Sequence, residues 1–102
     1  MNKQIFDTIV RLKRELIPDA RLILFGSQAR GNARPDSDWD LLALLNDDKK
    51  ESDYEDLFFD MVLEGSKLGT YFNILTYTEK EWEKRKITPL YKNIERDKLE
   101  II

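Results

Sequence analysis

Residues 26–40 read Gly-Ser-Gln-Ala-Arg-Gly-Asn-Ala-Arg-Pro-Asp-Ser-Asp-Trp-Asp and lie between two apolar runs, residues 22–25 and 41–45. Ten residues separate Ser27, just after the first run, from Asp38, and Asp38 and Asp40 lead into the second run. Alternate side chains of an extended strand share a face, so Asp38 and Asp40 are expected to point the same way and Trp39 the other way. The spacing predicts an acidic pair at the start of one strand, beside a Gly-Ser turn at the end of its neighbour.

The chemistry of these groups favours a metal ion and phosphates. Two carboxylates fixed side by side repel each other, and a divalent cation between them is the most economical compensation. The backbone N–H groups of a Gly26-Ser27 turn, together with the serine hydroxyl, suit phosphate oxygens. The stretch therefore predicts a metal-dependent site for phosphoryl or nucleotidyl transfer.

Each part of this pattern also has an ordinary structural interpretation. Gly26 could supply a positive φ in a turn, and Ser37 or Asp38 could form local hydrogen bonds within a turn. Asp40 could form a salt bridge with Arg30 or Arg34. For these structural interpretations to hold together, the Gly-Ser pair after a strand, the ten-residue spacing and the Asp-x-Asp entering the next strand would have to coincide by accident. We therefore favour the functional interpretation of the whole motif.

A different phosphate-binding motif is excluded. Gly26 and Gly31 have the spacing that opens a P-loop, which continues with Lys and then Ser or Thr. Asn32 and Ala33 follow here, so the lysine that reaches the terminal phosphates is absent.

Length and composition limit the possibilities further. The 102 residues are expected to form a single domain, residues 1–102, with one core and one site. The net charge is −3, which argues against broad nucleic-acid binding, because such binding needs a basic face. No apolar run approaches the length of a membrane span and no secretory leader is evident, so we expect no membrane and a cytoplasmic location.

The absence of two residue types restricts the metal chemistry. The chain contains no Cys and no His, which excludes thiol nucleophiles, an imidazole base and most zinc sites. Any metal must be held by oxygen ligands, which favours Mg²⁺ or Mn²⁺.

Hydrophobic periodicity predicts the element order α-β-β-α-β-α-α, with helices over one small sheet. In the first half of the chain we expect a helix that ends at Ile17-Pro18 and strands over 21–25 and 39–45. A second helix is expected to begin with a Ser52–Glu55 capping box and to end at Gly65 or Gly69, and a strand over 71–77 follows it. A short helix with a Thr78–Glu81 capping box and a last helix from Thr88-Pro89, with Leu90 and Ile94 in the core, complete the expected elements. The loop over 26–37 has room for one helical turn. The apolar tail at Leu99, Ile101 and Ile102 is expected either to dock on the core or to meet a partner.

The motif resembles that of the nucleotidyltransferases of the DNA polymerase β superfamily. The run Gly-Ser-Gln-Ala-Arg-Gly, followed by Ser-Asp-Trp-Asp-Leu, is most similar to the small MNT (minimal nucleotidyltransferase) branch, and the likeness spans almost the whole chain. The resemblance implies an α+β nucleotidyltransferase fold with a mixed three-stranded sheet flanked by helices. It also implies transfer of a nucleoside monophosphate, AMP from ATP, to an acceptor hydroxyl.

Within this resemblance each motif residue has an implied role. Asp38 and Asp40 would bind one or two Mg²⁺ ions, and Gly26 and Ser27 would hold the terminal phosphates of the nucleotide. Arg30 is the side chain best suited to neutralise leaving-group charge. The alternative for Arg30 is a structural ion pair with Asp36 or another nearby carboxylate.

One position departs from the superfamily pattern. The third carboxylate of the family, on a later strand, aligns with Asn73, which can offer a carbonyl oxygen but carries no charge and cannot act as a base. Catalysis is expected to be slow or lost, because a general base typically contributes about 10²–10⁴-fold. Asp60, Glu64 and Glu79 are alternatives for the missing carboxylate, although each is predicted on or beside a helix.

Three functions follow from these observations. The first is a Mg²⁺-dependent nucleotidyltransferase acting on a partner macromolecule, since MNT proteins are often antitoxins that adenylylate HEPN-type toxins. The second is a protein of the same fold that neutralises its partner by binding alone. The third, transfer to a small molecule or RNA, is disfavoured by the absence of a second domain and of a basic face.

Overall fold

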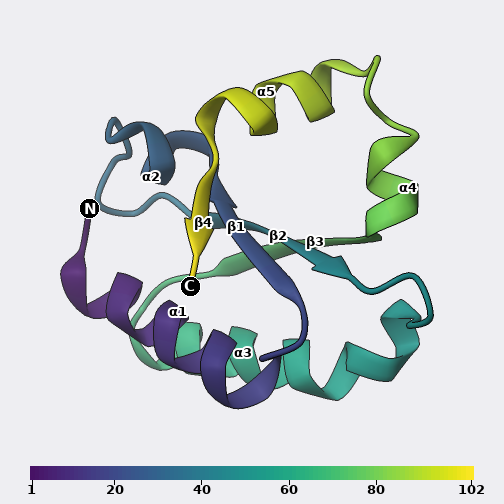
Figure 1. Cartoon of the computed structure of the whole chain (residues 1–102). Helices are drawn as coiled ribbons and strands as arrows, with labels where there is room; N and C mark the ends of the chain where they lie inside the picture. The colour runs from purple at the N-terminus through teal and green to yellow at the C-terminus, as the bar shows by residue number, and fades with distance from the viewer.

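The computed structural model describes residues 1–102, which form helices packed around one sheet (Figure 1). The elements are α1 (Lys3–Leu16), β1 (Arg21–Phe25), α2 (Gly26–Arg30), β2 (Trp39–Leu45), a 3₁₀ helix η1 (Glu51–Tyr54), α3 (Glu55–Lys67), β3 (Phe72–Thr78), α4 (Glu79–Glu83), α5 (Pro89–Asp97) and β4 (Leu99–Ile101). The predicted α+β class is confirmed, and the first two strands have the predicted bounds.

The sheet is mixed and has four strands in the order β3-β2-β1-β4. β2 runs parallel to β3, and β1 is antiparallel to both β2 and β4. The prediction of three strands is therefore wrong, because the C-terminal tail docks on β1 with Ile101 beside Leu22. Three residues are too few to show a strand period, so only the long-range pairing reveals β4.

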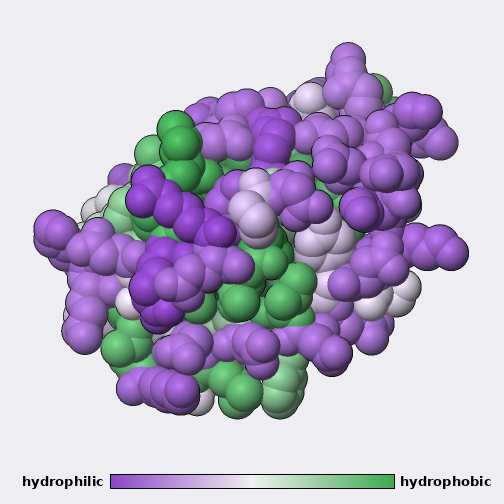
Figure 2. All heavy atoms as spheres, turned by 60° about the horizontal axis from the view of Figure 1, so that its bottom comes forward, coloured by the Kyte–Doolittle hydropathy of each residue, from purple (hydrophilic) through white to green (hydrophobic).

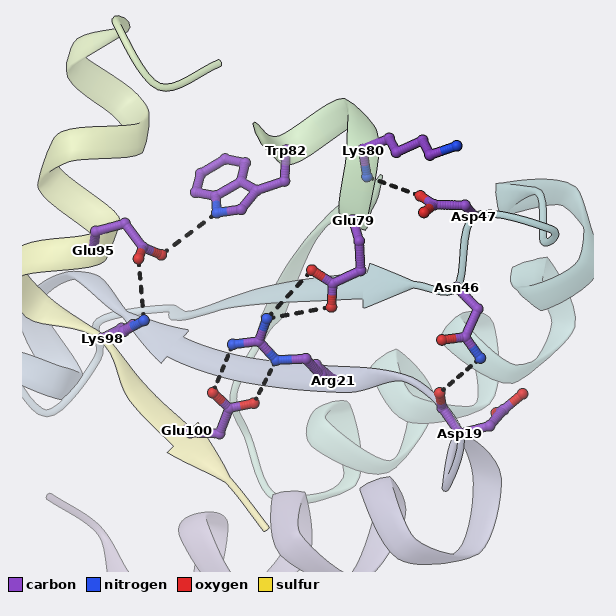
Figure 3. A network of polar contacts seen from close by, with 10 residues as sticks. All are labelled: Asp19, Arg21, Asn46, Asp47, Glu79, Lys80, Trp82, Glu95, Lys98 and Glu100. Carbon is purple, nitrogen blue, oxygen red and sulfur yellow. Dashed lines mark hydrogen bonds and ion pairs between the residues drawn. The ribbon is translucent and has the colours of Figure 1, made fainter. Parts of the chain in front are cut away.

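Side-chain contacts hold β4 on the sheet as well. Ile101 is buried, whereas Leu99 and Ile102 remain exposed. Arg21 of β1 donates two hydrogen bonds to the Glu100 carboxylate, at 3.0 and 2.9 Å, and also bonds Glu79 at the start of α4 (Figure 3). These ion pairs link β4, β1 and α4 on one face of the sheet.

Helices cover both faces of the sheet. α1 and α3 pack on one face, over a cluster that includes Leu22, Leu24 and Trp39. α4 and α5 lie on the other face, where Trp82 and Ile94 pack on β1 and β2 (Figure 1). β2 is buried along nearly its whole length, as its continuous apolar run predicts. Hydrophilic residues cover most of the side seen in Figure 2, with apolar atoms gathered near its centre.

Local signals succeeded at some helix ends and failed at others. The capping box of Thr78 and Glu81 is confirmed, and α5 begins at Pro89 as predicted, with Thr88 as its N-cap. At the start of the second long helix the prediction is wrong, since the N–H of Lys50 donates to the Asp53 carboxylate and a 3₁₀ turn precedes α3. Leu90, predicted in the core, is 37% exposed.

None of the helices combines the length and the apolar composition that crossing a bilayer requires.

Candidate active site

The site begins where β1 ends against the start of β2. Phe25, the last residue of β1, pairs with Asp40, and the next residue, Gly26, has a φ of 75°. A Cβ added at Gly26 would lie 2.5 Å from Oδ2 of Asp40. Gly26 is required both by its left-handed backbone and by this close approach, so the Gly-Ser turn lies directly against the carboxylate, as predicted.

Asn73 lies next to Asp40 on the neighbouring strand. The parallel register of β2 and β3 pairs Asp40 with Asn73, and Nδ2 of Asn73 donates a hydrogen bond of 3.3 Å to Oδ1 of Asp40. Both side chains point to the face covered by α4 and α5, because their neighbours Trp39 and Phe72 are buried on the opposite face. The structure thus places Asn73 beside Asp40 as an uncharged neighbour, and its correspondence with the family's third carboxylate stays a prediction.

Asp38 is the more exposed member of the acidic pair. It precedes β2, which begins at Trp39, whose N–H donates to the carbonyl of Tyr71 at 3.0 Å. The carboxylate of Asp38 has no hydrogen-bond or ion-pair partner within the chain and remains available to an external ligand.

Ser27 lies in the first turn of α2, where backbone N–H groups have no partner within the helix. Its carbonyl accepts from the N–H of Asn32 at 3.1 Å, and its half-buried hydroxyl has no partner in the chain. The turn ends at Gly31, whose φ is 80°.

Sequence reasoning missed Gln28. Its side chain is only 6% exposed, and Nε2 donates to the carbonyl of Ser37 at 3.4 Å. This bond ties α2 to the loop just before Asp38, so Gln28 helps to fix the acidic pair relative to the Gly-Ser turn. A lone glutamine in a polar loop carries no periodic signal by which it could have been found.

Arg30 is engaged in an ion pair. Its Nη1 lies 2.9 Å from Oδ2 of Asp97 at the end of α5, a carboxylate that Arg96 also contacts. Hydrogen bonds from Arg96 and then Arg30 lower the pKa of Asp97 to about 2. The alternative prediction for Arg30, a structural ion pair with a nearby carboxylate, is confirmed, and the partner is Asp97 rather than Asp36. A role for Arg30 in nucleotide binding stays a prediction.

The oxygen donors at the site fit a magnesium ion whose coordination is completed by oxygen atoms of substrate and water. Asp38, Asp40 and the Asn73 amide supply oxygen atoms only, and Mg²⁺ in proteins commonly uses one or two carboxylates together with phosphate oxygens. No group of three or more acidic side chains in the chain could hold a metal. Glu79 instead pairs with Arg21, and Glu64 pairs with Lys67.

Comparison with known proteins assigns the class. A family model described as "Nucleotidyltransferase domain" matches residues 6–100, so the chain belongs to the nucleotidyltransferase domain family. No curated protein matches the sequence.

Solved structures with the same fold include chains of toxin–antitoxin complexes. One, from a toxin–antitoxin crystal structure with AMP-PNP, is 19% identical and has a TM-score of 0.65 over 95% of this chain and 72% of that chain. A chain from a mutant of the toxin–antitoxin pair MntA–HpeT is 17% identical, with a TM-score of 0.66 over 100% of this chain and 73% of that chain. A third comes from a tri-AMPylated Shewanella oneidensis HEPN toxin in complex with MNT antitoxin, with 18% identity and a TM-score of 0.62 over 100% of this chain and 72% of that chain. At these identities the likeness establishes the fold.

Proposed function

We propose that this chain is a Mg²⁺-dependent nucleotidyltransferase that moves AMP from ATP to a hydroxyl group on a partner protein, as the antitoxin of a toxin–antitoxin pair. The observation that carries the proposal is the meeting of the Gly26-Ser27 turn with Asp40 at the ends of two adjacent strands. The end of β1 and the start of β2 thus bring groups suited to phosphate oxygens next to groups suited to a metal ion.

Asp38 and Asp40 would hold the metal ion, with the carbonyl oxygen of Asn73 as a further ligand once its amide turns. A bound Mg²⁺ would neutralise charge on the triphosphate and on the reacting oxygens. Ser27 and the N–H groups of the α2 turn would hold the terminal phosphates, leaving the α-phosphorus nearest the acceptor.

The reaction forms a bond between the acceptor oxygen and the α-phosphorus and breaks the bond from that phosphorus to the bridging oxygen, so that pyrophosphate leaves. The hydroxyl proton must go to water, because Asn73 has no basic group to accept it. General-base assistance is typically worth about 10²–10⁴-fold, so we expect a correspondingly slow enzyme.

A protein partner is supported by the solved structures of the same fold. Two of them are toxin–antitoxin complexes, and in a third the HEPN toxin beside an MNT antitoxin is AMPylated. The net charge of −3 of this chain suits a basic partner.

A second candidate function is neutralisation of the partner by binding alone. It is favoured by Asn73, which stands where the resemblance implies a carboxylate and donates a hydrogen bond to Asp40 instead of adding negative charge beside it. In that case the fold and the nucleotide site would persist without transfer.

Labelled ATP separates these functions. The chain is incubated with Mg²⁺, its co-purifying partner and ATP labelled at either the α or the γ phosphate. Label that reaches the partner only from the α position supports nucleotidyl transfer, and label from the γ position would show a kinase and refute the proposal. A stable complex without transfer favours the binding protein. The matched control is Asp38→Asn with Asp40→Asn, which is expected to remove transfer without changing the fold.

A further inference from the structure

An open groove runs along the outer edge of β3, between that strand and α3. Its volume is about 350 Å³, and its lining includes Phe58, Phe59 and Val62 of α3, together with Tyr71, Asn73 and Ile74. β3 is the end strand of the sheet, so its outer backbone edge has no partner strand. Of the four surface hollows of the molecule, this is the only one that Asn73 lines.

The groove gathers exposed aromatic surface in a very polar molecule. The Phe59 side chain is 62% exposed and that of Tyr71 is 51% exposed, while 36% of all residues in the chain are charged. Apolar surface that gathers in one exposed place marks interaction sites in soluble proteins. The apolar part of the groove begins beside the candidate active site.

The charge of the groove is negative at the end away from Asn73. Gly65, near the end of α3, lies against Phe72 at the start of β3, because a Cβ added at Gly65 would be 3.1 Å from the Phe72 ring. The start of α3 therefore lies toward the end of β3. Glu51 and Glu55 line the groove at that end, near Thr76. Neither glutamate forms an ion pair within the chain. Lys49, Lys50 and Arg85 line the adjoining hollow, which shares Glu51 and Thr76, and none of the three lines the groove itself.

The register of the sheet determines what a chain added beside β3 would present. Asp40 and Asn73 are cross-strand neighbours. A residue of an added strand that pairs with Asn73 would extend this row across the sheet, about 4.8 Å beyond β3. Its side chain would share their face of the sheet. The residues before and after it would point to the other face, where Ile74 and Thr76 border α3.

We propose that this groove binds an extended segment of the partner protein and presents the acceptor hydroxyl to the site. The segment adds a strand to the edge of β3, as peptides do at other exposed sheet edges. It carries the hydroxyl residue opposite Asn73, a large apolar residue beside it, and a Lys or Arg facing Glu51 and Glu55. The acceptor and the basic residue are three positions apart, as Asn73 and Thr76 are in β3. The assignment of the acceptor rests on the proposed function.

Two synthetic peptides test the docking surface without any reaction. The probes are Ala-Leu-Tyr-Leu-Ser-Arg-Ala and its reversed sequence, which present the same side chains in the two strand directions. Tyrosine is used because it reaches furthest among the hydroxyl side chains. Amide NMR shifts of the ¹⁵N-labelled chain report where they bind. We expect saturable shifts in β3 and along the groove side of α3 for one of the two peptides, and no competition from Mg²⁺-ATP.

Charge variants make the test specific. Glu51→Lys combined with Glu55→Lys is expected to weaken peptide binding at least about tenfold, equivalent to about 1.4 kcal/mol. Asp56→Lys, an exposed change on the same first turn of α3 but outside the groove lining, is the matched control and should have little effect. A peptide with Glu in place of Arg should bind more weakly to the wild type and better to the double variant.

Three results would overturn the proposal: no saturable shift at about 1 mM peptide, shifts centred on the α1 surface, or displacement of the peptide by Mg²⁺-ATP. The last would make the groove a nucleotide-base site. Transfer is scored separately with α-labelled ATP. A peptide that binds in the groove and receives no label would leave the docking surface intact while the proposed function fails.

Discussion

Gly26 combines a φ of 75° with a Cα that faces the Asp40 carboxylate, and these two constraints can be measured separately. Gly31 has a similar φ of 80° but open space where a Cβ would stand. Gly31→Ala should therefore destabilise the fold only by the left-handed penalty, about 1–2 kcal/mol. Gly26→Ala should cost about 1 kcal/mol more, because Asp40 must move and its bond to Asn73 is lost.

Urea unfolding of both variants measures this difference, and transfer activity should fall only in Gly26→Ala. Equal stabilities for the two variants would contradict the close approach of Gly26 and Asp40.

Because Asn73 is uncharged, the candidate site contains two carboxylates, Asp38 and Asp40. A single substitution tests whether Asn73 corresponds to the third carboxylate of the superfamily. Asn73→Asp replaces a hydrogen bond to Asp40 with charge repulsion, so without metal the fold should lose about 1 kcal/mol. Adding Mg²⁺ should restore the loss, so that Tm rises with Mg²⁺ more steeply than in the wild type, and transfer should become faster.

Asn73→Ala is the control for this substitution, since it removes the hydrogen bond without adding charge and should show no enhanced Mg²⁺ response. If Asn73→Asp responded to Mg²⁺ as the wild type does, the alignment of Asn73 with the third carboxylate would be wrong.

At the scale of elements, the two short pieces α2 and α5 are joined by charge. Arg30 reaches from α2 to Asp97 at the end of α5, and Arg96 contacts the same carboxylate. Because these guanidinium groups lower the pKa of Asp97 to about 2, the ionised carboxylate is favoured in the folded state. Its contribution to stability is present above the unfolded pKa of about 3.9 and is lost as the pH falls toward 2.

The corresponding measurement is the difference in Tm between the wild type and Asp97→Asn as a function of pH. The wild type should be more stable at pH 5 and above, and the difference should shrink as the pH falls from about 4 to 2. A difference that stays constant over this range would show that the ion pair does not join the two helices as described.

Elements with a strong periodic or breaking signal could be predicted from the sequence. α1 ends where Pro18 forbids continuation, and β2 is recognisable because its apolar run is buried on both faces. β4 could not be predicted, since its three residues gain their conformation from pairing with β1 and from the bond between Arg21 and Glu100. The start of α3 was mispredicted because two overlapping capping signals compete there, and Asp53 supplies the bond that forms.

At the scale of the whole molecule, the candidate site was predictable where the motif is local and uncertain where it depends on distant contacts. The placement of Gly26 beside Asp40 follows from two strands joined by one loop, and Asn73 follows from the strand after the next helix. The contact of Arg30 with Asp97 and the anchoring role of Gln28 involve pairings that no spacing in the sequence encodes.

The proposed transfer requires one bound ion between the Gly-Ser turn and the acidic pair. Mn²⁺ added with a nonhydrolysable ATP analogue to the ¹⁵N-labelled chain measures this directly, because the paramagnetic ion broadens the nearest amide signals. We predict that the signals of Ser27, Asp40 and Asn73 broaden first, and that Asp38→Asn with Asp40→Asn abolishes the effect. Broadening centred instead on the acidic residues at 51–56, or unchanged in the double variant, would contradict the site.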